Sequence, residues 1–141
     1  MLITGGAGFI GSTLSERLLE QGREVVCLDN FCDYYDPRRK RKNVEALLKR
    51  RNYTLVEGDI RDRAFMHELF LKHRFDTVVH LAAQPGVRLS LEQPQLYMDI
   101  NVNGTLNTLE AARDSRVEKF IFGSSSSVYG DSGVIPFSED G

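Results

Sequence analysis

Three glycines near the amino terminus have the spacing of a loop that binds phosphate groups. Gly5, Gly8 and Gly11 follow a short apolar run and precede a segment with the apolar spacing of a helix. Glycine permits a turn with positive φ and lets the backbone approach a pyrophosphate, whose charge the free amides at the start of the helix attract. The alternative is a tight strand-to-helix turn that binds no ligand.

A carboxylate at the end of the next apolar run makes the glycine pattern more specific. Asp29 can accept hydrogen bonds from the ribose hydroxyls of an adenine dinucleotide. It would repel the 2′-phosphate of NADP, and Asn30 and Phe31 stand where a phosphate-binding arginine would follow. These residues therefore predict NAD rather than NADP, although Arg38 and Arg39 could compensate from further along the loop.

Two later segments end where ligands bind in open parallel sheets. Asp59 and Ile60 follow the third apolar run, and we expect them in the same cleft as the glycines. Asp59 could instead be a helix cap. The end of the fourth run contributes four more candidate residues: Leu81, Ala82, Ala83 and Gln84.

The chain alternates between strand-like and helix-like segments. The expected strands are Leu2–Thr4, Glu24–Leu28, Tyr53–Val56, Thr77–Leu81 and Lys119–Phe122. Apolar residues at helical spacing lie between them, in the sets Phe9, Ile10, Leu14, Leu18 and Leu19; Phe65, Leu69 and Phe70; Tyr97, Val102, Leu106, Leu109 and Ala112. Continuous apolar strands are typical of a parallel sheet covered on both faces, so we predict an α/β fold with a Rossmann-like, doubly wound parallel sheet.

Composition excludes several classes of protein. A chain of 141 residues that is 41% hydrophobic can bury one core, which predicts a single domain over residues 1–141. The net charge of -2 gives no net attraction to nucleic acid or to anionic lipid, and no apolar run is long enough to span a membrane. Cys27 and Cys32 are interpreted as reduced thiols, and the start of the chain lacks the features of a signal peptide. We expect a cytoplasmic protein with no nucleic-acid or membrane partner.

Several other features have plain structural explanations. The basic run at residues 38–42 is expected to be the solvated start of a helix. His80 lies in an apolar run and is expected to be a buried, hydrogen-bonded histidine. His67 and His73 do not share a helix face as metal ligands would, so we predict no metal site.

Two adjacent tyrosines follow the second apolar run. Tyr34 and Tyr35 are interpreted as solvent-facing loop residues; the alternative is that they pack near an adenine or a partner subunit.

Six motifs follow one another in an order that resembles the extended short-chain dehydrogenase/reductase family of NAD-dependent epimerases and dehydratases. They are TGGAGFIG, the ribose-binding Asp29, EGDIRD, HLAA, NVNGT and SSSSVYG. Within the family, the segments DNFCDYYDP and HLAAQPGVRLSLEQP look most like the UDP-glucuronate 4-epimerases, although Cys32 and Pro85 depart from that group's usual residues. UDP-glucose 4-epimerases and sugar-nucleotide dehydratases are the alternatives.

The resemblance implies a cofactor site, a catalytic residue and substrate contacts. Ser125 would hold the C4 oxygen of a UDP-sugar while C4 is transiently oxidised by NAD and then reduced again, an isomerase reaction. The implied NAD-binding residues are Gly5, Gly8, Phe9, Ile10, Gly11, Asp29, Asn30, Phe31, Asp59, Ile60, Leu81, Ala82, Ala83, Gln84 and Asn101. The implied substrate contacts are Gly86, Val87, Arg88, Ser125, Ser126 and Ser127.

The family's catalytic base, the Tyr of a YxxxK pair, is expected beyond Gly141. Tyr129 is not that residue, because Gly133 stands where the Lys should be. We therefore expect an amino-terminal fragment, truncated before the last strands and the substrate domain and inactive alone, from a parent that is a homodimer. Two other hypotheses remain open: a non-catalytic nucleotide-binding module, and an NADPH-linked reductase of the same fold.

Overall fold

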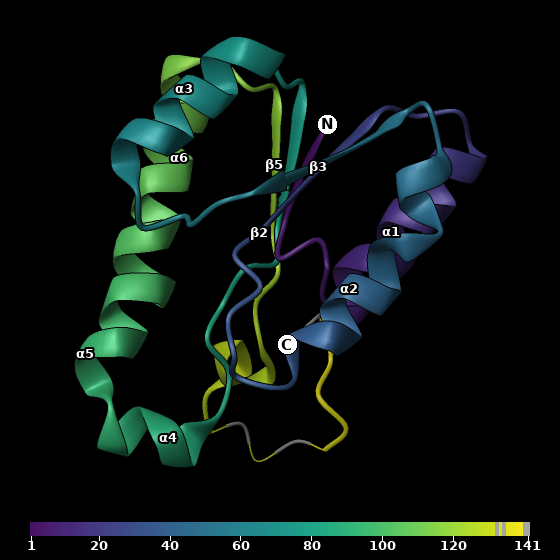
Figure 1. Ribbon diagram of the computed structural model, residues 1–141. Coiled ribbons are helices and arrows are strands. Elements are labelled where there is room, and N and C mark those ends of the chain that lie inside the picture. Colours follow the sequence, from purple (N-terminus) through teal and green to yellow (C-terminus); the bar gives the residue numbers. More distant parts are fainter. Residues whose placement is uncertain (132, 134, 140–141) are drawn as a thin grey trace.

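A parallel sheet of five strands forms the centre of the computed structural model, which describes residues 1–131, 133 and 135–139 (Figure 1). The strands are β1 (Leu2–Thr4), β2 (Val25–Asp29), β3 (Tyr53–Glu57), β4 (Thr77–His80) and β5 (Lys119–Phe122). Their order is β3-β2-β1-β4-β5, and all neighbouring pairs are parallel. The order reverses between β1 and β4, which is where open sheets of this kind bind ligands. The predicted Rossmann-like, doubly wound fold is confirmed.

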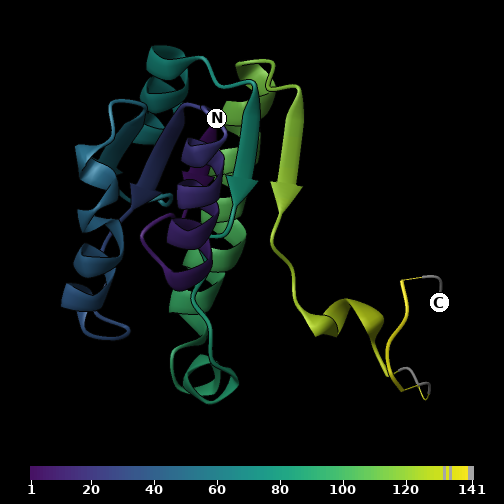
Figure 2. The ribbon, with the colours of Figure 1, turned by 90° about the vertical axis from the view of Figure 1, so that its right-hand side faces the viewer.

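Helices cover both faces of the sheet. Figure 1 shows α1 (Phe9–Glu20) and α2 (Pro37–Glu45) on one side, and α3 (Arg63–His73) and α6 (Thr105–Asp114) on the other. The short helix η1 (Leu47–Lys49) follows α2. The segments α4 (Val87–Glu92), α5 (Pro94–Tyr97) and the π-helical η2 (Met98–Gly104) lead into α6. The 3₁₀ turn η3 (Ser126–Tyr129) follows β5 and stands away from the sheet layers (Figure 2).

Two apolar clusters hold the layers together. Because side chains alternate along a strand, Leu2 and Ile3 of β1 point to opposite faces. Leu2 packs with Phe70 and other residues of one cluster, whereas Ile3 packs with Leu19 and residues of the second. Both faces of the sheet are therefore sealed by helices, as its continuous apolar strands require.

The sequence located the elements better than their ends or buried faces. β2 ends at Asp29 and β4 at His80, one residue away from the predicted limits. In α1, Leu19 is buried, but Phe9 and Ile10 from the same predicted stripe are 80% and 67% exposed. Helical spacing thus identified the helix but not which of its apolar residues reach the core. Over the described residues, the structure contains no helix long and apolar enough to cross a membrane.

Candidate nucleotide-binding site

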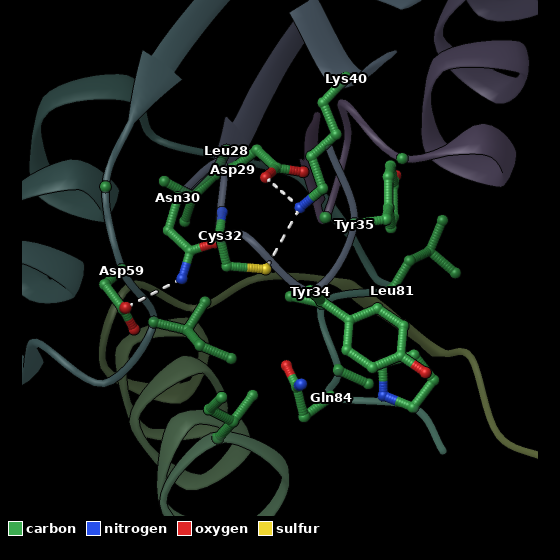
Figure 3. A pocket seen from close by; sticks show the side chains of 18 residues that line it. Leu28, Asp29, Asn30, Cys32, Tyr34, Tyr35, Lys40, Asp59, Leu81 and Gln84 are labelled. Atoms are coloured by element: carbon green, nitrogen blue, oxygen red, sulfur yellow. Dashed lines mark hydrogen bonds and ion pairs between the residues drawn. The ribbon is translucent and has the colours of Figure 1, made fainter. Parts of the chain in front are cut away.

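A pocket lies where the loops after β1, β2, β3 and β4 meet, and Figure 3 shows its lining side chains. Ten of the residues expected to bind the cofactor line it: Gly5, Gly8, Asp29, Asn30, Asp59, Ile60, Leu81, Ala82, Ala83 and Gln84. The other lining residues are Leu28, Cys32, Tyr34, Tyr35, Lys40, Gly58, Pro85 and Ile100. The convergence of parallel strand ends therefore brings together residues from four separate loops.

The glycine turn at the start of α1 has no room for side chains. Gly5 has a φ of +64°, and a Cβ there would lie 2.8 Å from the backbone nitrogen of Ala82. A Cβ on Gly11 would lie 2.6 Å from the carbonyl oxygen of Gly5. Gly8 is the N-cap of α1 and supplies no side-chain cap, so the first amides of the helix keep their capacity to bind an anionic group. This cradle fits a pyrophosphate.

Asp29 is tied to three groups around the pocket. Its Oδ2 accepts the backbone N–H of Ala7 at 3.1 Å, and its Oδ1 accepts that of Phe31 at 2.9 Å. Lys40 Nζ donates to the same Oδ1 at 2.9 Å, and the two side chains are only 10% (Lys40) and 2% (Asp29) exposed (Figure 3). The amide of Asn43 also donates to the carbonyl oxygen of Ala7. These bonds fasten α2 to both the end of β2 and the glycine turn.

Lys40 is buried, so the expectation of a fully solvated basic run is wrong at this residue. Lys40, Val44 and Leu47 are spaced three and four residues apart, which places them on one face of α2 and η1, and all three are buried. Burial alone would lower the pKa of Lys40. The hydrogen bond to Asp29, the charge of Asp29 and the nearby Cys32 and Tyr35 together outweigh burial and raise the pKa, so the ammonium stays charged.

Tyr34 and Tyr35 both line the pocket. Tyr34 is exposed, as expected of a solvent-facing loop residue, whereas Tyr35 is half-buried. Tyr34 remains 42% exposed, and a Cβ on Gly86 would lie 2.8 Å from its hydroxyl oxygen. The Tyr35 ring lies 5.7 Å from the ammonium of Lys40. The loop after β2 therefore contributes aromatic surface to the site, which agrees with the alternative interpretation of the two tyrosines.

Asp59 belongs to the pocket rather than to a helix cap. Its Oδ2 accepts a hydrogen bond from the side-chain amide of Asn30 at 3.0 Å (Figure 3). The carboxylate also accepts hydrogen bonds from the backbone N–H and the guanidinium of Arg61. The cap of α3 is Asp62, which accepts the backbone N–H of Phe65. Burial would raise the pKa of Asp59, but the bonds from Arg61 and Asn30 outweigh it and lower the pKa to about 2.

His80 is a buried, hydrogen-bonded core residue, as predicted. The Thr4 hydroxyl oxygen accepts the N–H groups of Leu81 and Ala82, both at 3.2 Å, so its own hydrogen is donated to His80 Nδ1 at 2.7 Å. His80 Nε2 therefore carries the ring proton and donates to the Thr105 hydroxyl at 3.0 Å. Burial lowers the pKa of His80 to about 4.

Five of the expected cofactor residues do not line the pocket: Phe9, Ile10, Gly11, Phe31 and Asn101. Phe31 is 6% exposed and lies in the core, under the guanidinium of Arg41. Asn101 does not line the pocket itself but supports a residue that does, because its side chain forms hydrogen bonds with both backbone polar groups of Gln84.

The expected substrate residues are not gathered at the pocket either. Gly86 is the N-cap of α4, which begins with Val87 and Arg88, and Val87 is 83% exposed. Ser125, Ser126 and Ser127 are exposed at η3, where Ser125 Oγ accepts the backbone N–H of Ser127 at 3.3 Å. Among the described residues, no three His, Cys, Asp or Glu side chains are grouped to hold a metal ion.

A parallel sheet with a glycine cradle and a buried acid at its switch point defines a Rossmann-type nucleotide-binding domain. The family model described as GDP-mannose 4,6 dehydratase matches residues 2–141. The chain therefore belongs to this family, whose relatives include NAD-dependent epimerases and dehydratases, and the resemblance inferred from the six motifs is confirmed.

Several curated relatives are nucleotide-sugar epimerases. UDP-glucuronate 4-epimerase 3 of Arabidopsis thaliana is 46% identical over 140 residues, which are 99% of this chain and 32% of the relative. A UDP-glucose 4-epimerase of Klebsiella pneumoniae is 42% identical over 99% of this chain and 98% of the relative. The chain thus spans about a third of the length of the first of these relatives.

Solved structures of the same class share the fold. The UDP-glucose 4-epimerase of Stenotrophomonas maltophila, with NAD and formylated UDP-arabinopyranose, aligns over 98% of this chain and 40% of that chain, with a TM-score of 0.84 and 36% identity. The Thermus thermophilus UDP-glucose 4-epimerase in complex with NAD aligns over 88% of this chain and 37% of that chain, with a TM-score of 0.76 and 40% identity.

Proposed function

We propose that residues 1–141 form the NAD-binding part of a nucleotide-sugar 4-epimerase. The observation that carries the proposal is the meeting of the glycine cradle, Asp29 and the Leu81–Gln84 segment at one pocket beside the switch between β1 and β4. Related structures that contain NAD support the choice of cofactor.

In this proposal the pyrophosphate of NAD lies against Gly5, Gly8 and the first amides of α1. Asp29 accepts a ribose hydroxyl through Oδ2, which has only the Ala7 N–H as partner among the described residues. Asp59 and Ile60 lie beside the adenine. NAD supplies the hydride acceptor and donor for C4 of the sugar, and the protein's part is to bind and orient it.

The substrate is proposed to be a UDP-sugar, with UDP-glucuronate favoured because the first curated relatives act on it. UDP-glucose is the second candidate, supported by the Klebsiella relative. Ser125 is proposed as the hydrogen-bond donor to the C4 oxygen, with Ser126, Ser127 and residues 86–88 as further sugar contacts. This assignment rests on the SSSSVYG and HLAAQPGVR motifs.

We also propose that the whole enzyme is a homodimer that packs along η2 and α6. Met98, Val102, Leu106 and Leu109 are 52%, 47%, 52% and 44% exposed. Their spacing of four, four and three residues puts them on one helix face, and a continuous apolar face of this kind suits a two-fold interface between identical chains.

Sedimentation should show that Leu106→Glu dissociates the dimer, whereas Leu71→Glu, at a 71% exposed residue of α3, leaves it intact. A monomeric parent protein would overturn the dimer.

We infer a cytoplasmic location because both cysteines, Cys27 and Cys32, are free thiols.

The cofactor proposal is tested by calorimetric titration of this chain with NAD. NAD is expected to bind and to raise the melting temperature, because a ligand that binds only the folded state stabilises it. Gly8→Val, which places a side chain in the cradle, should abolish binding, while Gly133→Val outside the cradle should not. A chain that is folded but does not bind NAD would refute the proposal.

A further inference from the structure

Lys40 lies against the carboxylate that the proposed NAD site uses, so it alters the charge that a dinucleotide meets there. Asp29 Oδ1 and Lys40 Nζ are 2.9 Å apart, and both groups are buried. The net charge of the Asp29–Lys40 pair is close to zero, so a ligand in the pocket meets little net charge from it. The repulsion that an isolated Asp29 would exert on a 2′-phosphate is therefore offset by the neighbouring ammonium.

The other basic residues of α2 do not take this position. Among the described residues, Lys40 is the only Lys or Arg that lines the pocket. Arg38 is exposed and paired with Asp36, and Arg41 is paired with Glu57. The compensating cation considered for residues 38 and 39 is thus supplied by the next residue along, on the helix face that carries Val44 and Leu47.

The ammonium of Lys40 retains the capacity to bind a ligand. In the part of the chain that the structure describes, it has two hydrogen-bond acceptors, Asp29 Oδ1 and Cys32 Sγ at 3.6 Å. An ammonium has three N–H donors, so one remains. If Asp29 lost its charge, the ammonium would lose its main partner and would need another anion nearby.

We propose that Lys40 is the specificity-determining residue of the cofactor pocket. Asp29 engages its ammonium, so the cation that lines the pocket is not free to bind the 2′-phosphate of NADP. Removal of the Asp29 charge frees Lys40 to bind the 2′-phosphate of NADP. The inference rests on the proposed cofactor function.

The test is a set of calorimetric dissociation constants for NAD and NADP. Asp29→Asn is expected to tighten NADP binding at least tenfold and to weaken NAD binding. Adding Lys40→Met to Asp29→Asn should remove the gain for NADP, whereas adding Arg39→Met, an exposed change on the same helix, should keep it. A gain that survives Lys40→Met, or no gain in a folded Asp29→Asn variant, would overturn the inference.

A second measurement decides the matter if Asp29→Asn does not fold. In the otherwise natural chain, Lys40→Met should weaken NADP binding relative to NAD at least fivefold, because it leaves Asp29 uncompensated, and Lys40→Arg should restore the ratio. An unchanged ratio would overturn the role of Lys40 while leaving NAD binding intact. Failure of the natural, folded chain to bind either nucleotide would overturn both the inference and the proposed function.

Discussion

Asn101 binds both backbone polar groups of Gln84, accepting its N–H at 2.7 Å and donating to its carbonyl oxygen at 3.0 Å. Gln84 is 8% exposed and lines the pocket, whereas Asn101 stands behind it in the π-helical segment η2. Wide helical turns of this kind are frequent at functional sites. The Asn101 side chain therefore holds in place the segment after β4 that lines the pocket.

Replacement of Asn101 with Ala should weaken NAD binding about tenfold, since an unsatisfied buried backbone group costs about 1–3 kcal/mol. Asn103→Ala is the matched control, because Asn103 is exposed on the same segment and bonds only to Asp99 among the described residues. Calorimetric titration of both variants measures the effect. Equal losses for the two would show that the Gln84 contact does not shape the site.

Gly11→Ala should destabilise the fold by about 1–3 kcal/mol, the usual cost of overpacking. The added Cβ would lie 2.6 Å from two backbone atoms, the Gly5 carbonyl oxygen and Gly6 Cα, which cannot move aside as a flexible side chain can. Gly133→Ala is the control, because no described atom lies within 4 Å of its added Cβ. Urea unfolding compares the two, and a neutral Gly11→Ala would contradict the close packing of α1 on the turn.

Much of the site could be predicted because parallel strands bring their carboxyl ends to one edge. Asp29, Asp59 and the segment from Leu81 follow three different strands, and the fold places them around one pocket. Once the apolar runs are recognised as parallel strands, their end residues are candidates without any knowledge of side-chain geometry.

Residues placed by the docking of a helix or loop could not be predicted in the same way. The burial of Lys40 depends on how α2 packs on the glycine turn, which a basic run does not reveal. Tyr34 reaches the pocket through an irregular loop. Ser125 follows β5 like the other candidates follow their strands, yet it lies exposed at η3 and not in the pocket lining.

Lys40→Ala should destabilise the chain by about 3 kcal/mol, because it leaves a buried carboxylate without its cation. The two backbone N–H bonds to Asp29 keep the loss near the lower end of the usual range. Arg17→Ala, which breaks an exposed pair with Glu20, should cost only about 0.5 kcal/mol. The double variant Asp29→Asn with Lys40→Met removes both charges, and it should be more stable than Lys40→Ala in urea unfolding. If Lys40→Ala were the more stable of the two, the result would count against a buried ion pair between Asp29 and Lys40.

Stability should fall as the pH drops from 6.5 toward 4, owing to His80. Burial lowers the pKa of this histidine from 6.5 to about 4, so within that window the unfolded chain binds a proton that the folded chain does not. The contribution of His80 to the free energy of unfolding is fully present above pH 6.5. It decreases as the pH falls to about 4, by up to about 3 kcal/mol.

His73 adds to the same pH window, because burial also lowers its pKa, but the side chains around His80 do not. Thr4, Thr105 and the rings of Phe120 and Phe122 face it, and none of these side chains titrates near neutral pH. The depressed pKa of Asp59 acts only at lower pH, below its ordinary value of 3.8. Urea midpoints should therefore fall between pH 6.5 and 4 in the natural chain and in His67→Gln, while His80→Gln, less stable at neutral pH, should lose most of this slope. If His80→Gln kept the full slope, the proton taken up on unfolding would belong to another group.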